Sequence, residues 1–388
     1  MKTQYKIEVQ DIFNLYGEEY RKVNGKTMST RQYRAMRQIE MCRTSALGGH
    51  KERCTDCEKE RISYNSCRNR HCPKCQFLKR EKWLEDRLKD FLPVNYFHVV
   101  FTVPDTINAV ALGNQKAVYN ILFRSVSETL KDLSNDKKYL GAKTGLICIL
   151  HTWGQSLIYH PHIHCIVPGG GLSCDNGKWI DSPSNFLFPV KVMSKLFRGK
   201  FLHYLKESYE KGELKYHEYN KSFSSLLNGL YKKEWVVYSK PPFKNPETVF
   251  RYLSNYTHRI AISNHRIIKL HDDKVFFKWR DYSDSSKEKV MALDALEFIR
   301  RFLLHILPDG FVKIRHYGLF SNRNKSSSLE NCRRMLGIQQ KEFDETVETW
   351  KEMLLRITGF DVDRCPYCGK GKMIIVETIL PKNCNSPP

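Results

Sequence analysis

Residues 145–171 have the sequence GLICILHTWGQSLIYHPHIHCIVPGGG, and this stretch decides the fold of the central part of the chain. It contains two β-rich runs, Gly145–Trp153 and His162–Val167, and the second run ends at a proline and three glycines. Side chains alternate between the two faces of a strand, so His162 and His164 share one face while the residue between them points to the core. The stretch predicts two strands of a sheet, with a pair of imidazoles on one face.

Further strands and helices precede and follow this stretch. Residues 95–103 form a β-rich run that is followed by a proline, and residues 115–133 have the apolar spacing of a helix. Downstream, residues 266–279 are expected to form a hairpin around an Asp-Asp turn, and residues 287–305 a helix. Mixed strands and helices in this order predict the α+β class, with helices packed on an antiparallel sheet.

The motifs divide the chain into three expected regions. Residues 1–91 combine helices with a cysteine-rich segment and predict a small zinc-binding, DNA-binding domain. Residues 92–330 hold the α+β domain, with an insertion at about 183–232 that is rich in Lys, Tyr and Ser. Residues 331–388 are expected to form a helical tail with a single CxxC pair.

The charge balance points to a polyanionic partner. The 388 residues include 64 Lys and Arg against 42 Asp and Glu, a formal net charge of +22. An excess of this size is typical of proteins that bind nucleic acid or an anionic membrane surface. No stretch approaches the roughly 18 consecutive apolar residues of a membrane-spanning helix, and the N-terminal residues lack the apolar core of a signal peptide. We therefore expect a cytoplasmic protein that binds nucleic acid and no membrane.

The cysteines predict a metal site. Six of the 13 cysteines lie between Cys42 and Cys75, and two CxxC pairs, Cys54/Cys57 and Cys72/Cys75, are separated by 14 residues. A CxxC turn directs two thiolates to one point, and two such turns supply the tetrahedral sulfur cage that zinc favours. We expect one structural Zn²⁺ ion held by the two CxxC pairs.

Other cysteines and histidines are candidates for further metal ligands. Four of them lie in the same segment: Cys42, His50, Cys67 and His71. They either complete a second tetrahedral zinc site or serve as framework residues around the first. Near the C-terminus, Cys365 and Cys368 form half of a zinc ribbon, and only Cys384 follows them as a possible partner.

Basic residues gather in two stretches. Residues 61–80 carry six Lys or Arg and no acidic residue, which favours a phosphate-contacting surface over a solvated face of mixed charge. Residues 311–325 interleave Lys and Arg with aromatic residues that can stack on unpaired bases. For two further arginines, 259 and 266, solvation at the surface is an equal alternative. The predicted DNA contacts are Arg61, Arg68, Arg70, Lys74, Lys79, Arg80, Arg259, Arg266, Lys313 and Arg315.

Two patterns in the α+β region carry reactive groups. His162 and His164 can bind one divalent ion from a strand face, but they need at least one further ligand. A helix with an Asn cap is expected over about 245–258, and Tyr252 and Tyr256 lie four residues apart on it, so their hydroxyls share one face. Such a tyrosine pair is usually a packing feature. Here it occurs together with the histidine pair in a basic, cysteine-rich chain.

The combination of HxH and YxxxY resembles the HUH endonucleases, which nick single-stranded DNA through a tyrosine. Longer stretches are more specific: RTSALGGHKERC (43–54), SCRNRHCPKCQ (66–76), HTWGQSLIYHPHIHCIVPGGG (151–171), YLSNYTHRIAISN (252–264) and GFVKIRHYG (310–318). Together they resemble the rolling-circle transposases of the insertion-sequence-ninety-one type, over about residues 8–330. The resemblance implies an N-terminal zinc-binding domain followed by a two-tyrosine HUH nuclease domain, in a prokaryotic, nucleoid-associated protein.

The resemblance also implies a chemistry for the two patterns. The strand histidines would hold a catalytic Mg²⁺ or Mn²⁺ ion, and related nucleases place a Glu or Gln where Gln155 stands here, with His160 as the competing third ligand. Tyr252 or Tyr256 would attack a single-stranded or hairpin transposon end, giving a 5′-phosphotyrosine and a free 3′-OH. The ester conserves the energy of the broken bond, so joining to another strand needs no ATP.

Other functions are compatible with the same residues. A replication initiator or a relaxase would share the nicking chemistry, but the zinc module and the stretches at 43–54 and 66–76 favour a transposase. A non-catalytic zinc-finger DNA-binding regulator would use the histidines only as structural residues. A zinc hydrolase would also use HxH, but no nearby Asp completes such a site.

Overall fold

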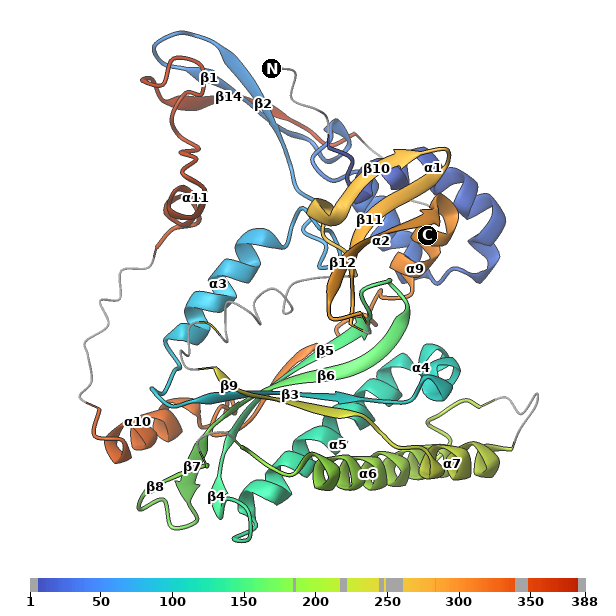
Figure 1. Cartoon of the computed structure of the whole chain (residues 1–388). Helices are drawn as coiled ribbons and strands as arrows, with labels where there is room; N and C mark the ends of the chain where they lie inside the picture. Colours follow the sequence, from blue (N-terminus) through green and yellow to red (C-terminus); the bar gives the residue numbers. More distant parts are fainter. Residues whose placement is uncertain are drawn as a thin grey trace. The chain divides into compact units, whose positions relative to one another are not determined.

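The computed structural model describes residues 6–183, 186–216, 222–243, 248, 261–282, 284–338 and 348–382 (Figure 1). The chain forms two compact units, each built from segments that are far apart in the sequence. One unit contains residues 1–82, 258–306 and 342–388, and the other contains residues 83–257 and 307–341. Both combine helices with antiparallel sheets, which confirms the predicted α+β class.

The larger sheet belongs to the unit formed by 83–257 and 307–341. Its five strands follow the order β13-β5-β6-β3-β9, and every neighbouring pair is antiparallel. They are β3 (Tyr96–Thr102), β5 (Gly145–Trp153), β6 (Tyr159–Pro168), β9 (Val237–Phe243) and β13 (Ile314–Gly318). A small sheet in the same unit contains β4 (Ala142–Lys143), β7 (Gly170–Ser173) and β8 (Trp179–Asp181).

Helices cover one face of the five-stranded sheet (Figure 1). α5 (Gln115–Asn135) packs on β5 and β6, and α6 (Val190–Glu210) packs on α5 and β9. The ring of Phe197 in α6 meets that of Phe101 in β3 edge to face, with centroids 5.2 Å apart. The remaining helices are α3 (Phe77–Leu88), which crosses the boundary at residue 82, α4 (Asn108–Gly113), α7 (Phe223–Lys232) and α10 (Lys325–Met335).

An apolar cluster lies on the opposite face of the sheet. Ile147 and Ile149 of β5 pack there with Leu84 of α3 and with Leu329 and Cys332 of α10. Because side chains alternate along a strand, the next residue of β5 on this face is at position 151. The helices thus bury one end of this face, and the imidazoles of the candidate site lie further along it.

The unit formed by 1–82, 258–306 and 342–388 contains two three-stranded sheets, in the orders β14-β1-β2 and β10-β11-β12. The strands are β1 (Gly49–Cys54), β2 (Glu60–Tyr64), β10 (Ile267–His271), β11 (Lys274–Asp281), β12 (Lys287–Asp294) and β14 (Met373–Ile379). The helices are α1 (Val9–Asn24), α2 (Thr30–Glu40), α9 (Ala295–Leu303) and α11 (Trp350–Thr358).

Side-chain caps define where α2 and α9 begin. The hydroxyl of Ser29 accepts a hydrogen bond from the backbone N–H of Gln32, and Asp294 caps the first turn of α9 in the same way. The apolar face of α9 then packs on α1, where the rings of Phe13 and Phe302 meet edge to face at 5.3 Å. These contacts attach residues 264–306 to the N-terminal helices.

Most predicted elements are confirmed, and one is corrected. β5 covers the predicted run 145–153, and α5 begins at the predicted residue 115. The helix expected over 287–305 is a helix only from Ala295 on, because residues 287–294 pair with β11 along their whole length as strand β12. The stretch 183–232, expected as an insertion, contributes α6, whose Phe197 and Phe201 are fully buried.

The grouping of segments differs from the linear division at residues 91 and 330 that the motifs suggested. In the described part of the chain, residues 261–282, 284–306 and 348–382 belong to the same compact unit as the N-terminal residues 6–82. The C-terminal region is helical in α10 and α11, but it also contains the strand β14. That strand adds to β1, which joins the two ends of the chain in one sheet.

Candidate functional site

A group of imidazoles lies on one face of the five-stranded sheet. In the hairpin of β5 and β6, His151 is opposite His162, and Ile149 is opposite His164. Residues directly opposite each other in an antiparallel pair point to the same face. The ligand nitrogens of the three histidines all lie within 4.8 Å of one another, and all three side chains are buried.

The neighbouring strand β3 adds a fourth histidine. Val100 is opposite His164, and His98 lies two residues away on the same face of β3. Nε2 of His98 is 2.8 Å from Nδ1 of His164, and the two rings stack with centroids 5.0 Å apart. The contact orients the His164 ring, as partner groups commonly do for metal-binding histidines.

The backbone sets the tautomer of His162. Its Nδ1 lies 2.6 Å from the carbonyl oxygen of His160, and a carbonyl can only accept, so Nδ1 carries the proton and donates. Nε2 then keeps its lone pair, which is the form of imidazole that binds a metal. Burial lowers the pKa of His162 to about 3 and that of His98 to about 4, so both rings are neutral at pH 7.

His151 is a member of the group that the sequence patterns did not reveal. Gln155, the third ligand implied by the family resemblance, lies in the turn between β5 and β6 and is half-buried. His160 stands at the start of β6, outside the group of three imidazoles. The sequence signal for His151 was its place near the end of one strand of a hairpin, but only the register shows that it faces His162.

The tyrosines and the basic residues have different outcomes. Tyr252, Tyr256 and Arg259 lie outside the described residues, so their roles stay predictions. Arg68 and Lys79 are exposed. Most of the other predicted DNA contacts bind protein groups. Three form ion pairs, Arg61 with Glu52, Lys74 with Glu8 and Arg80 with Glu81, whereas Arg266 donates to the Lys278 carbonyl and Arg315 lies over the Phe123 ring. Arg70 and Lys313 are half-buried.

Eight of the cysteines form two groups of four. In the first group the sulfur atoms lie within 4.8 Å of one another, and the members are Cys42, Cys67, Cys72 and Cys75. The sulfur of Cys75 is 3.5 Å from that of Cys42 and 3.6 Å from that of Cys67. Zn–S bonds of about 2.3 Å in a tetrahedron separate the sulfur atoms by about 3.8 Å, whereas a disulfide bond is about 2.05 Å long. The spacing suits four thiolates around a zinc ion.

The second group joins the two ends of the chain. Its sulfur atoms also lie within 4.8 Å of one another, and its members are Cys54, Cys57, Cys365 and Cys368. The sequence had suggested that the first CxxC pair would join the next pair along the chain. The structure groups the pairs differently, because β14 pairs with β1 and brings the C-terminal CxxC turn to the N-terminal one.

His50 and His71 lie outside both cysteine groups. Nε2 of His50 is 3.4 Å from Oε1 of Glu52, and Nδ1 of His71 is 3.2 Å from Oδ1 of Asn69. A tetrahedral zinc site takes four ligands. Each cysteine group supplies four sulfur atoms, so both are complete without either histidine.

A pocket of about 1250 Å³ lies elsewhere in the unit that contains the histidines. Residues of α5, β13 and α10 line it, and its basic groups are those of Lys131, Lys143, Arg333 and Arg334. None of the four histidines is among the residues that line it. The pocket also has the acidic side chains of Glu128 and Glu330 in its lining, and it is distinct from the imidazole group.

Two family models match the chain. One is described as a transposase zinc-binding domain and matches residues 12–103, and the other is described as "Putative transposase" and matches residues 145–328. The chain is also 47% identical over 379 residues to "Putative transposase y4qJ" of Sinorhizobium fredii, with 95% of each chain covered. The chain belongs to this transposase family.

A second relative is the transposase of a named insertion sequence. The chain is 24% identical over 290 residues to "Transposase for insertion sequence element IS801" of Pseudomonas savastanoi pv. phaseolicola, covering 73% of this chain and 68% of the relative. These matches confirm the resemblance to transposases of the insertion-sequence-ninety-one type. No solved structure shows a significant match to the chain.

Most residues of the candidate sites lie within the two matched regions. Residues 145–328 include three of the four histidines, and residues 12–103 include the whole first cysteine group. The zinc-binding match covers only two members of the second group, since the other two lie at positions 365 and 368. Within the described ranges, the transposase has no helix long and apolar enough to cross a membrane.

Proposed function

We propose that this transposase nicks and rejoins single-stranded DNA at the ends of its element through a 5′-phosphotyrosine, and so drives rolling-circle transposition. The observation that carries the proposal is the buried group of His151, His162 and His164, within the region that matches the transposase family. Buried imidazoles whose ligand nitrogens converge within 4.8 Å are suited to hold a divalent ion beside a phosphate.

The donor set favours one of the two ions expected from the resemblance. Mg²⁺ demands oxygen ligands, whereas imidazole binds first-row transition ions. Of the two, Mn²⁺ therefore fits His151, His162 and His164 better, and the amide oxygen of Gln155 would be the hard ligand that Mg²⁺ needs. When bound, the ion would polarise the scissile phosphate and offset the negative charge that develops on it.

Neighbouring residues would keep the imidazoles ready for this role. His98 restrains the His164 ring at 2.8 Å, and the carbonyl of His160 holds the proton of His162 on Nδ1. The ring of Trp153 stacks on that of His151 with centroids 4.6 Å apart. Because these groups fix the rings before DNA arrives, little reorganisation would remain for the moment of cleavage.

Tyr252 and Tyr256 are the proposed nucleophiles. A free tyrosine has a pKa of about 10, so the hydroxyl must lose its proton to attack phosphorus. The new bond between the tyrosine oxygen and phosphorus replaces the bond to the 3′ oxygen, which leaves as the 3′-OH after it takes up a proton. With a second tyrosine, the protein can cleave a second strand while the first stays attached.

The first cysteine group would serve DNA binding by holding its module folded. We propose one structural zinc ion at Cys42, Cys67, Cys72 and Cys75. The exposed Arg68 lies between two of these ligands, and the exposed Lys79 follows the last of them by four residues. Zinc would therefore fix the backbone that carries both cations, and chelation would weaken DNA binding as it unfolds the module.

Covalent trapping tests the proposal. Purified protein is incubated with labelled single-stranded transposon-end DNA and Mn²⁺ and then denatured. We expect a covalent adduct with the native protein, and none with His162→Ala or with Tyr252→Phe/Tyr256→Phe. His50→Ala is the matched control, because His50 lies outside the histidine and cysteine groups. DNA binding without any adduct in the native protein would favour the regulator instead.

A further inference from the structure

We propose that Cys54, Cys57, Cys365 and Cys368 hold a second structural zinc ion, and that this ion fastens the C-terminal segment of the chain into the N-terminal module. Two of its four ligands, Cys365 and Cys368, lie beyond the match to the zinc-binding family, which ends at residue 103. The site is also independent of the proposed nicking chemistry, since all four ligands and the segment belong to the unit that lacks the histidine group.

The sulfur atoms already have the spacing of a zinc tetrahedron. Two contacts between the CxxC pairs have the same length: the sulfur atoms of Cys54 and Cys368 are 3.7 Å apart, and so are those of Cys57 and Cys365. This agrees with the edge of about 3.8 Å for Zn–S bonds of about 2.3 Å. It is far longer than a disulfide bond of about 2.05 Å.

Backbone N–H groups point at the sulfur atoms in both turns. In the N-terminal turn, the N–H of Asp56 lies 3.4 Å from the sulfur of Cys54. In the C-terminal turn, the N–H of Tyr367 lies 3.4 Å from the sulfur of Cys365, and that of Gly371 lies 3.5 Å from the sulfur of Cys368. Hydrogen bonds to the charged form stabilise a thiolate, which is the state that binds zinc.

Strand pairing brings the two turns together. β14 runs antiparallel to β1 from the pair Gly49 and Ile379 to the pair Cys54 and Met373, with one irregularity. Beyond the end of this ladder, the backbone N–H of Thr55 donates to the carbonyl oxygen of Lys372 at 3.0 Å. The ladder therefore delivers the C-terminal CxxC turn to the N-terminal one in a fixed register.

The two turns touch at a glycine. A Cβ atom added to Gly371 would lie 2.5 Å from the sulfur of Cys54 and 2.8 Å from Oδ1 of Asp56. Real Cβ atoms do not come this close to other heavy atoms, so a side chain at this position would displace the sulfur. Only glycine lets the C-terminal turn approach the N-terminal ligands this closely.

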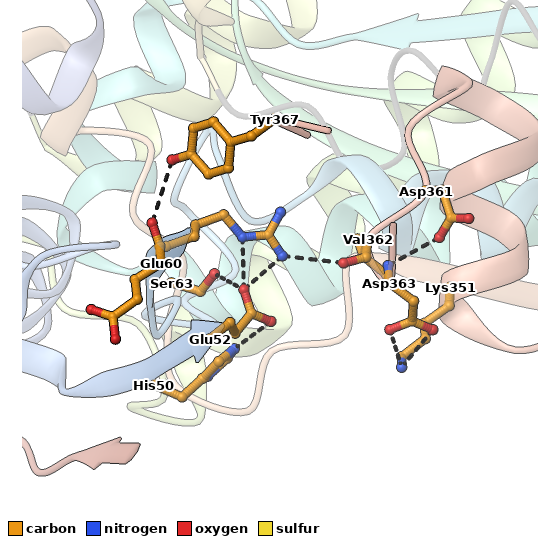
Figure 2. Close-up of polar contacts among 10 residues, drawn as sticks. His50, Glu52, Glu60, Ser63, Lys351, Asp361, Val362, Asp363 and Tyr367 are labelled. Carbon is orange, nitrogen blue, oxygen red and sulfur yellow. Dashed lines mark hydrogen bonds and ion pairs between the residues drawn. The ribbon is translucent and has the colours of Figure 1, made fainter. Parts of the chain in front are cut away.

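Polar contacts along β2 also hold the C-terminal segment that carries Cys365 and Cys368 (Figure 2). Arg61 donates from Nε to Glu52 at 2.7 Å and from its terminal nitrogen to the carbonyl oxygen of Val362 at 3.1 Å. The hydroxyl of Tyr367 points at the carbonyl oxygen of Glu60 at 3.5 Å. These hydrogen bonds orient the segment.

The segment is too poor in buried side chains to be held by packing. Among residues 348–382 of the described chain, the buried side chains are those of Met353, Cys365 and Met373. Small units with so little core need a metal or a disulfide to stay folded. The sulfur spacing excludes a disulfide, so the zinc ion is what keeps this C-terminal segment folded against the N-terminal module.

Zinc counting on the full-length protein tests the proposal. Native mass spectrometry should show two zinc ions per chain in the unaltered protein. Cys365→Ser/Cys368→Ser and Cys54→Ser/Cys57→Ser should each retain one ion, and the exposed control Cys174→Ser should retain two. A single zinc in the unaltered protein, or two in Cys365→Ser/Cys368→Ser, would overturn the proposal.

A second variant keeps all the ligands and covers the case in which the cysteine variants do not fold. Gly371→Ala should speed the release of one of the two zinc ions to a chelating dye by at least tenfold, while the other ion leaves at its normal rate. Equal release of both ions from Gly371→Ala and from the unaltered protein would contradict the proposed contact. Because zinc content is read without DNA, neither result depends on whether the protein nicks.

Discussion

Nε2 of His98 lies 2.8 Å from Nδ1 of His164, so a residue of β3 orients an imidazole of β6. One nitrogen of this pair must donate and the other accept, and the contact therefore fixes the tautomers of both rings together. The ring of His164 is also within the group formed with His151 and His162. His98, which lies outside the HxH motif, thus positions His164, which belongs to it.

Replacing His98 with Phe should lower the affinity for the catalytic metal ion more than it destabilises the fold. The substitution keeps a ring in the strand but removes the nitrogen that orients His164, and loss of such a partner typically costs 10–100-fold in metal affinity. We expect the Mn²⁺ concentration for half-maximal adduct formation to rise by about that factor. His98→Gln, which keeps a hydrogen-bonding group, should recover part of it. An unchanged Mn²⁺ requirement with a lower melting temperature would mean that His98 has only a structural role.

Stability should fall in acid between pH 6.5 and 4, in protein without added Mn²⁺ or Mg²⁺. Burial lowers the pKa of His98 to about 4, whereas a histidine of the unfolded chain titrates near 6.5. In this window the unfolded state binds more protons, so the free energy of unfolding decreases as the pH falls and recovers as it rises. His98 alone contributes at most about 3 kcal/mol. Urea unfolding of His98→Phe should show a smaller loss between pH 7 and 5, and an equal loss would contradict this assignment.

Arg68 and Lys79 should contribute directly to the salt dependence of DNA binding. Both are exposed beside the first cysteine group, and each phosphate contact on single-stranded DNA adds about 0.7 to the slope of log affinity against log salt. Arg68→Ala and Lys79→Ala should each lower the slope by about that amount, for any DNA sequence. Lys22→Ala is the control, since Lys22 pairs with Glu18 on α1. Slopes equal to that of the unaltered protein would place the DNA elsewhere.

Arg266, in contrast, should contribute to the stability of the fold and not to DNA binding. Its Nε donates to the Lys278 carbonyl at 2.7 Å, and its side chain is buried next to the ring of Phe277. Arg266→Ala should lower the free energy of unfolding by about 1–3 kcal/mol, because the carbonyl loses its donor. The salt slope of DNA binding should not change. A reduced slope with normal stability would show that Arg266 contacts phosphate after all.

Local sequence patterns predicted the strands well, but they did not predict which distant segments pair. Alternation along one strand was enough to place His162 and His164 on a common face, and β5 occupies the predicted residues. Finding His151 required the register of a hairpin, and finding His98 required a third strand, neither of which periodicity contains.

The cysteines show the same limit at larger separation. The CxxC spacing indicated turns whose sulfur atoms converge on one point, and the structure brings these sulfur atoms together, but the spacing favoured the nearest partner along the chain. Cys54 instead meets Cys368, a residue 314 positions away, because β14 returns to β1. Likewise, residues 287–294 have helix-like spacing in isolation but form β12, because β11 offers a complete ladder of partners.

Mass spectrometry of the trapped protein–DNA adduct tests the central claim most directly. The native protein is reacted with a short single-stranded transposon end and Mn²⁺, digested with a protease and a nuclease, and searched for peptides that carry a 5′-linked nucleotide. We predict that the nucleotide is attached to Tyr252 or Tyr256, and that the attachment is lost in His162→Ala. A nucleotide attached to any other residue, or one that still forms in His162→Ala, would contradict the account.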